Sequence, residues 1–123
     1  QATAVAITGA TVLKLSDSGG VFTVAQSSTY DIDLPSPTSG AGCSYYFSLT
    51  APGAFSPTIT VDGGAATFVG TIVEDNSCVV CTGSTLTFVG TGVIGDNIEI
   101  RSLATNLYSV RAFTSGASKI TIS

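Results

Sequence analysis

The chain has 123 residues, of which 44% are hydrophobic and only 10% are charged, with a net charge of −4 and no histidine, methionine or tryptophan. This length suits one domain over 1–123 with its own core, and the apolar content excludes disorder. The four basic residues are too few for nucleic-acid binding, and no apolar run approaches the ~20 residues of a membrane helix. We therefore expect neither a nucleic-acid nor a membrane partner.

Short β-prone segments follow one another from the N-terminus, separated by glycine, serine and aspartate. Thr11–Leu15 and Val21–Ala25 flank the turn residues 17–20, which predicts a first β-hairpin. Tyr30–Leu34 alternates strictly between apolar and acidic residues, so one face of this strand should meet the core. Cys43–Thr50 is the next predicted strand, and its Cys43 is expected to be a buried, unpaired cysteine.

The second half of the chain continues the same pattern. Thr58–Val61 and Thr67–Val73 flank Asp62, Gly63 and Gly64, which predicts a second hairpin. Further strands are expected at Ser84–Val89, Asn97–Leu103, Leu107–Phe113 and Lys119–Ile122. Together these segments predict an all-β fold, an antiparallel, jelly-roll-like β-sandwich of about nine short strands.

The spacing Cys78-Val79-Val80-Cys81 is the most specific local motif. Structural zinc needs four cysteine or histidine ligands, and the chain offers three cysteines and no histidine. Redox catalysis needs the pair at the start of a helix, and no helix is predicted here. The remaining interpretations are two reduced thiols or a disulfide between Cys78 and Cys81 across the segment 74–83, and we expect the disulfide if the protein matures outside a reducing cytosol.

A second candidate site combines acidic and aromatic residues. Asp31 and Asp33 lie two apart on one strand, so their carboxylates should share its polar face, where they could hold Ca²⁺ or act on a sugar. Tyr45, Tyr46 and Tyr108 could add an aromatic platform, although adjacent strand residues face opposite sides and core packing competes for them. These five residues are the predicted exposed binding face.

Catalysis is not expected. Without histidine the chain lacks the commonest acid and base near neutral pH, and no nucleophile stands in a recognisable setting. The run 90–95 matches the letters GxGxxG, but a strand rather than a helix is predicted to follow it, so it predicts a turn. We predict no catalytic residue, no metal site and no cofactor.

The C-terminal strands carry a resemblance to a protein class. The segments Gly95–Ile100, Tyr108–Ala112 and Gly116–Ile122, within a chain rich in threonine, serine and glycine, resemble small β-domains of virus structural proteins. Such domains form capsid decoration (cement) proteins and fibres of tailed phages and large DNA viruses. The resemblance implies a noncatalytic protein on the virion surface, forming homo-oligomers, with a trimer favoured, and contacting the major capsid protein or further copies of itself.

Two other functions stay open at this stage. A secreted or cell-surface adhesin or carbohydrate-binding module would use the predicted acidic and aromatic face. A subunit of an extracellular filament would fit the low charge and the start at Gln1. The apolar fraction of 44% favours an assembled subunit, because it can exceed what a core of this size holds and so points to buried faces between subunits.

Overall fold

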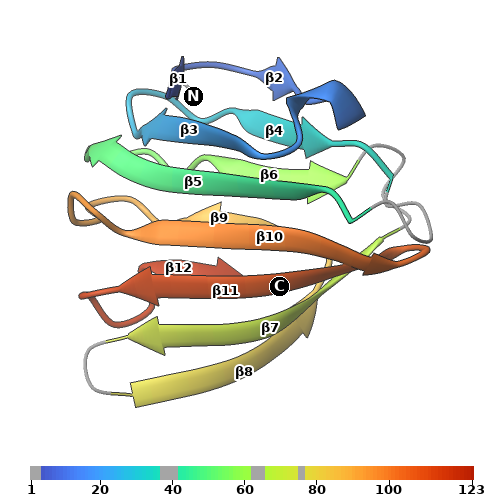
Figure 1. The fold of residues 1–123 in the computed structure, drawn as a ribbon. Helices are drawn as coiled ribbons and strands as arrows, with labels where there is room; N and C mark the ends of the chain where they lie inside the picture. Colours follow the sequence, from blue (N-terminus) through green and yellow to red (C-terminus); the bar gives the residue numbers. More distant parts are fainter. Residues whose placement is uncertain (1–3, 37–41, 62–65, 75–76) are drawn as a thin grey trace.

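The computed structural model describes residues 4–36, 42–61, 66–74 and 77–123, with the side chains of 77–80 outside the description. Strands dominate it (Figure 1). They are β1 (Val5–Ile7), β2 (Thr11–Val12), β3 (Gly20–Ala25), β4 (Asp31–Leu34), β5 (Ser44–Ala51), β6 (Thr58–Val61), β7 (Thr67–Glu74), β8 (Ser77–Gly83), β9 (Leu86–Phe88), β10 (Asn97–Ala104), β11 (Leu107–Thr114) and β12 (Ile120–Ile122).

The strands form two sheets that pack face to face. The seven-stranded sheet has the order β1-β3-β5-β10-β11-β7-β8, and the five-stranded sheet has the order β12-β9-β6-β4-β2. The expected all-β sandwich is therefore confirmed. The strand count is higher than expected because β1 and β8 were not predicted. The first predicted strand is shorter than expected and ends at β2, before a 3-10 turn at Leu15–Asp17.

The chain crosses between the sheets after every strand from β1 to β6, which returns β7 to the seven-stranded sheet. Odd-numbered strands of this stretch lie in the seven-stranded sheet and even-numbered ones in the five-stranded sheet. Successive strands of one sheet therefore run in the same direction, so that β1, β3 and β5 are parallel, as are β2, β4 and β6. The first six strands thus form three coils of a two-sheet solenoid.

This winding corrects the expected antiparallel arrangement. Both sheets are mixed, and antiparallel pairing enters with the hairpins β7–β8 and β10–β11 and with β9 and β12. Neither predicted hairpin forms, because β2 and β3 lie in opposite sheets, as do β6 and β7. Two strands joined by a turn can pair in one sheet as a hairpin, or they can lie in opposite sheets and be joined by an arch. In both cases the apolar face of each strand meets the core, so the same alternating pattern with a glycine-rich turn is compatible with either connection.

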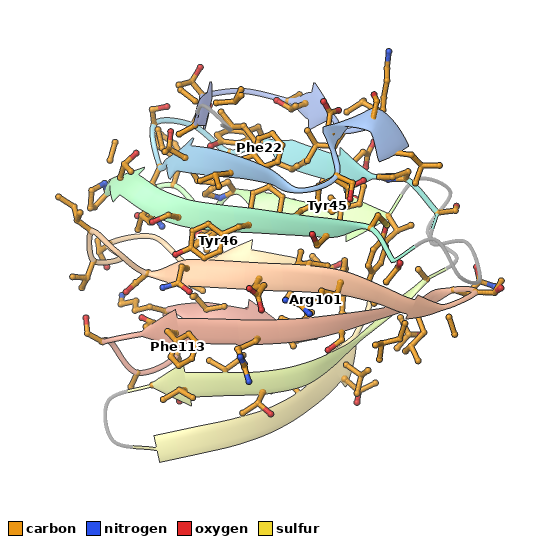
Figure 2. The ribbon with its side chains drawn as sticks, viewed as in Figure 1. Phe22, Tyr45, Tyr46, Arg101 and Phe113 are labelled. Atoms are coloured by element: carbon orange, nitrogen blue, oxygen red, sulfur yellow. The ribbon has the colours of Figure 1, made fainter. Side chains whose placement is uncertain are left out.

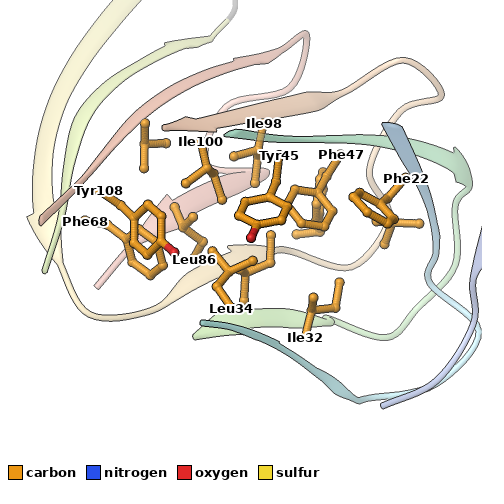
Figure 3. Packing of buried hydrophobic residues seen from close by; sticks show 14 of the residues in the cluster. Phe22, Ile32, Leu34, Tyr45, Phe47, Phe68, Leu86, Ile98, Ile100 and Tyr108 are labelled. Carbon is orange, nitrogen blue, oxygen red and sulfur yellow. The ribbon is translucent and has the colours of Figure 1, made fainter. Parts of the chain in front are cut away.

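The core fills the space between the two sheets. Phe22 and Phe47 stack with ring centroids 5.5 Å apart, and Phe68 and Tyr108 stack at 5.8 Å. Figure 3 shows these rings projecting from the seven-stranded sheet toward aliphatic side chains that include Leu34 of the five-stranded sheet. Strict alternation along β4, β5 and β10 supplies seven of the buried apolar side chains: Ile32, Leu34, Tyr45, Phe47, Leu49, Ile98 and Ile100.

Gly70 lets β7 approach β11 closely. A Cβ atom at this position would overlap the backbone carbonyl oxygen of Val110 on β11. Since these two residues are register partners in the longest parallel pairing of the molecule, a side chain here would push the two strands apart. A side chain at Gly9, by contrast, would meet no atom within 4 Å.

We predict that Gly70→Ala lowers the free energy of unfolding by about 1–3 kcal/mol, the usual cost of overpacking. Urea denaturation of the two variants measures this, with Gly9→Ala expected to stay within about 0.5 kcal/mol of the wild type. Equal stability of the two variants would show that β7 and β11 are not packed as described.

Candidate functional site

The five residues of the predicted binding face lie in three separate places. Asp31 and Asp33 lie on the outer face of the five-stranded sheet, and Tyr46 lies on the outer face of the seven-stranded sheet, on the opposite side of the molecule. Tyr45 and Tyr108 are buried in the core between the sheets. The prediction of one shared face is therefore wrong, while core packing of Tyr45 and Tyr108 is confirmed.

The two aspartates are held by threonine hydroxyls of the neighbouring strand β6. Thr58 donates to Oδ1 of Asp31 at 2.8 Å, and the Thr60 hydroxyl lies 2.6 Å from Oδ2 of Asp31 and 2.9 Å from Oδ1 of Asp33. Within the described residues, no group of three or more histidine, cysteine, aspartate or glutamate side chains could hold a metal ion. The acidic pair is thus built into a hydroxyl-rich sheet surface.

The buried tyrosines have polar partners that match their environment. The Tyr108 hydroxyl donates to the Pro35 carbonyl oxygen and lies 3.9 Å from Sγ of Cys43, and the Tyr45 hydroxyl donates to the Lys14 carbonyl oxygen. Burial raises the pKa of both phenols above their usual value of 10, and the neighbouring Cys43 thiol adds to the rise. Both phenols therefore stay neutral and serve the core.

The cysteines differ from the expected pairing. Cys81 is a free thiol in β8, so the bridge to Cys78 is not formed in the structure; the Cys78 side chain lies outside the described residues. Cys78 and Cys81 both lie in the extended strand β8 (Ser77–Gly83), in which the Cα atoms of residues three apart lie ~10 Å from each other, whereas bridged Cα atoms lie within ~7 Å. Cys43 is buried and unpaired, as expected.

Most of the chemistry that sequence reasoning missed lies on the outer face of the seven-stranded sheet. Its central row crosses β5, β10, β11 and β7 as Tyr46, Glu99, Arg111 and Thr71, each opposite the next. Arg101 stands two residues beyond Glu99 on the same face. Tyr46, Glu99, Arg101, Leu103, Arg111 and Phe113 together are called the β10–β11 face below; Figure 2 labels Tyr46, Arg101 and Phe113 on it.

Charge distinguishes this face from the rest of the molecule. It holds two of the four basic residues of a chain whose net charge is −4, with one glutamate opposite Arg111. Both arginines are exposed, while Glu99 between them is half-buried. The face therefore has a surplus of one positive charge, while the opposite sheet presents Asp31 and Asp33.

Three shallow hollows mark the same sheet. The largest of the three, of about 470 Å³, lies over β7, β10 and β11 and is lined by Gly70 and Ser109 beside the two arginines. A second, of about 230 Å³, lies on the other side of β10 and is lined by Tyr46, Ser44, Glu99 and Arg101, among others. A third, of about 300 Å³, is bordered by the apolar side chains of Val73, Ile94 and Phe113.

Exposed apolar side chains complete the face. Leu103 is 60% exposed and Phe113 is 44% exposed, and both point outward from strands whose alternate residues are buried. Alternation along the two strands could have placed these residues outward from the sequence. The sequence alone does not show which strands are neighbours in the sheet. It therefore could not predict that Tyr46, Arg101 and Phe113 lie on the same face.

Comparison of the chain with protein-family models, with curated proteins and with solved structures found no match. No helix among the described residues is long and apolar enough to span a membrane.

The buried phenols generate a prediction about alkaline stability. In the unfolded chain the two phenols lose their protons near pH 10, whereas in the folded chain they keep their protons to higher pH. The free energy of unfolding therefore falls as the pH rises above about 10. Urea midpoints should therefore fall from about pH 9 to about pH 11, and Tyr108→Phe should reduce this slope. Tyr108→Phe also loses the hydrogen bond to Pro35, but that loss lowers stability equally at every pH and does not change the slope. If the urea midpoint of Tyr108→Phe falls with pH as steeply as that of the wild type, the raised pKa of Tyr108 is contradicted.

Proposed function

We propose that this protein is a noncatalytic structural subunit of a virion, a capsid decoration protein that docks on the shell through the β10–β11 face. The observation that carries the proposal is the make-up of that face. Arginine and aromatic side chains with exposed apolar neighbours are enriched at the centres of protein interfaces, and they contribute most of the binding energy there. Tyr46, Arg101, Arg111, Leu103 and Phe113 supply this combination.

The shape of the face supports a protein partner. Its hollows are shallow depressions over a continuous sheet, and the neighbouring core side chains are well packed beneath them. Docking would remove Leu103 and Phe113 from water, which stabilises a complex by about 25 cal/mol for each Å² of apolar surface buried. The absence of histidine from the chain agrees with a binding role rather than acid–base catalysis.

The virion assignment rests on the resemblance of the C-terminal segments to virus structural domains. Those segments fall on β10, β11 and β12, and the first two of these strands carry most of the β10–β11 face. Of that face, Glu99 and Arg111 lie within the segments, and Arg101, Leu103 and Phe113 follow them on the same two strands. The proposal places the protein on the particle surface, in contact with the major capsid protein or with further copies of itself.

Rebinding to stripped particles tests this role. Virions from the source would be depleted of the protein and mixed with purified wild type, Phe113→Ser, Arg101→Glu or the control Phe55→Ser, and binding would be measured by co-sedimentation. Phe55 is 49% exposed, close to the 44% of Phe113, but lies in the loop between β5 and β6. We expect wild type and Phe55→Ser to rebind alike and the two face variants to bind about 30-fold more weakly. Wild type that does not rebind, or equal loss in Phe55→Ser, would refute the proposal.

A sugar-binding module is the second candidate, favoured by the hollow beside Tyr46. There an aromatic ring adjoins Ser44, Glu99 and Arg101, which offer hydrogen-bond donors and acceptors. A glycan array probed with and without Ca²⁺ should then give hits that Tyr46→Ala abolishes. An array with no hits would remove this candidate and leave the shell role standing.

A further inference from the structure

Both sheets of the sandwich end together at the N-terminal coil. β1 is an edge of the seven-stranded sheet and β2 is an edge of the five-stranded sheet, and the two strands follow each other in the first turn of the solenoid. Figure 1 shows both at the same end of the molecule. The first and last coils of a solenoid need a polar cap, because without one the surface that would contact the next coil is exposed to water.

The backbone of β2 is oriented for further pairing. The Leu13 amide donates to the Asp33 carbonyl oxygen at 2.8 Å, toward β4. Because successive residues of a strand direct their backbone groups to opposite sides, the N–H and C=O of Val12 point away from β4, to the outer edge. The sequences of the two edge strands, Val-Ala-Ile and Thr-Val, contain none of the lysines or prolines that block pairing within an edge strand.

The same end exposes apolar side chains. Val5 is 52% exposed, Val12 is 65% exposed and Leu15 is 50% exposed, although Ile7 and Leu13 beside them are buried. These three belong to β1, β2 and the adjoining 3-10 turn. This coil therefore combines open strand edges with apolar surface, as a surface between subunits does.

We propose that this end pairs with the same end of a second copy of the chain, forming a two-fold dimer in which both sheets continue from one protomer into the other. A single added strand could cover only one of the two edges. A two-fold axis normal to the sheets brings β1 against β1 of the partner and β2 against β2 of the partner, antiparallel in both cases. A second copy is therefore the occupant that covers both edges at once.

This dimer is a consequence of the solenoid winding and is independent of the shell role. It uses the end of the sandwich, so the β10–β11 face stays free in the dimer. It also differs from the trimer that the resemblance to virus domains implies. A two-fold axis places each edge strand against the same strand of one partner, which gives a closed dimer and not a trimer.

Size-exclusion chromatography with light scattering on the full chain, over a range of concentrations, tests the dimer. We expect twice the mass of the chain at high concentration and dissociation on dilution. Val12→Pro removes the outward N–H but leaves the bond from Leu13 to Asp33 intact, and it should raise the dissociation constant at least tenfold. Val12→Thr retains the N–H and the β-branched shape and should stay close to wild type.

Circular dichroism and thermal melting confirm that each variant is folded, and Val5→Lys, which adds a charge without altering the backbone, replaces Val12→Pro if the latter unfolds. A wild type that remains monomeric at millimolar concentration, or a dimer or trimer that Val12→Pro and Val5→Lys leave unchanged, would overturn the inference. A monomeric Val12→Pro that still rebinds to stripped particles would separate this interface from the shell contact.

Discussion

The alternation of successive strands between two sheets is the constraint on which the rest of the structure depends. It makes β1, β3 and β5 parallel neighbours in one sheet and β2, β4 and β6 parallel neighbours in the other. The later hairpin β10–β11 then enters between β5 and β7, which places Tyr46 beside Glu99 and Arg111 beside Thr71. Because the winding begins at β1 and β2, it also leaves both sheets with an edge at the same end.

Much of the fold follows from local sequence, and its connectivity does not. The alternation of Tyr30–Leu34 and of Cys43–Thr50 identified strands with one buried face, and the structure buries Ile32, Leu34, Tyr45 and Phe47 accordingly. The choice between a hairpin and an arch to the other sheet depends on which distant strand offers the better partner. The residues at 17–20 and 62–64, from which turns were predicted, do not encode that choice, so both expected hairpins were wrong.

The candidate site illustrates the same limit. Alternation shows that only one of the neighbouring residues Tyr45 and Tyr46 can face outward, but which one does so depends on the sheet that packs beneath β5. Asp31 and Asp33 were correctly placed on a polar face, yet their threonine partners come from β6, 27 or more residues away in sequence. The two faces of the sandwich consequently differ in character: one bears carboxylates held by hydroxyls, and the other bears arginines, a tyrosine and exposed apolar groups.

We propose that the β10–β11 face is covered by another protein in the virion. Hydroxyl-radical footprinting of the free protein and of intact virions, read out by mass spectrometry, measures the solvent access of single side chains. If the face is covered, oxidation of Tyr46, Leu103 and Phe113 falls severalfold in virions, while that of Phe55, which lies off the face, is unchanged. Equal oxidation of the face residues in both states, or protection of Phe55 in their place, would contradict it.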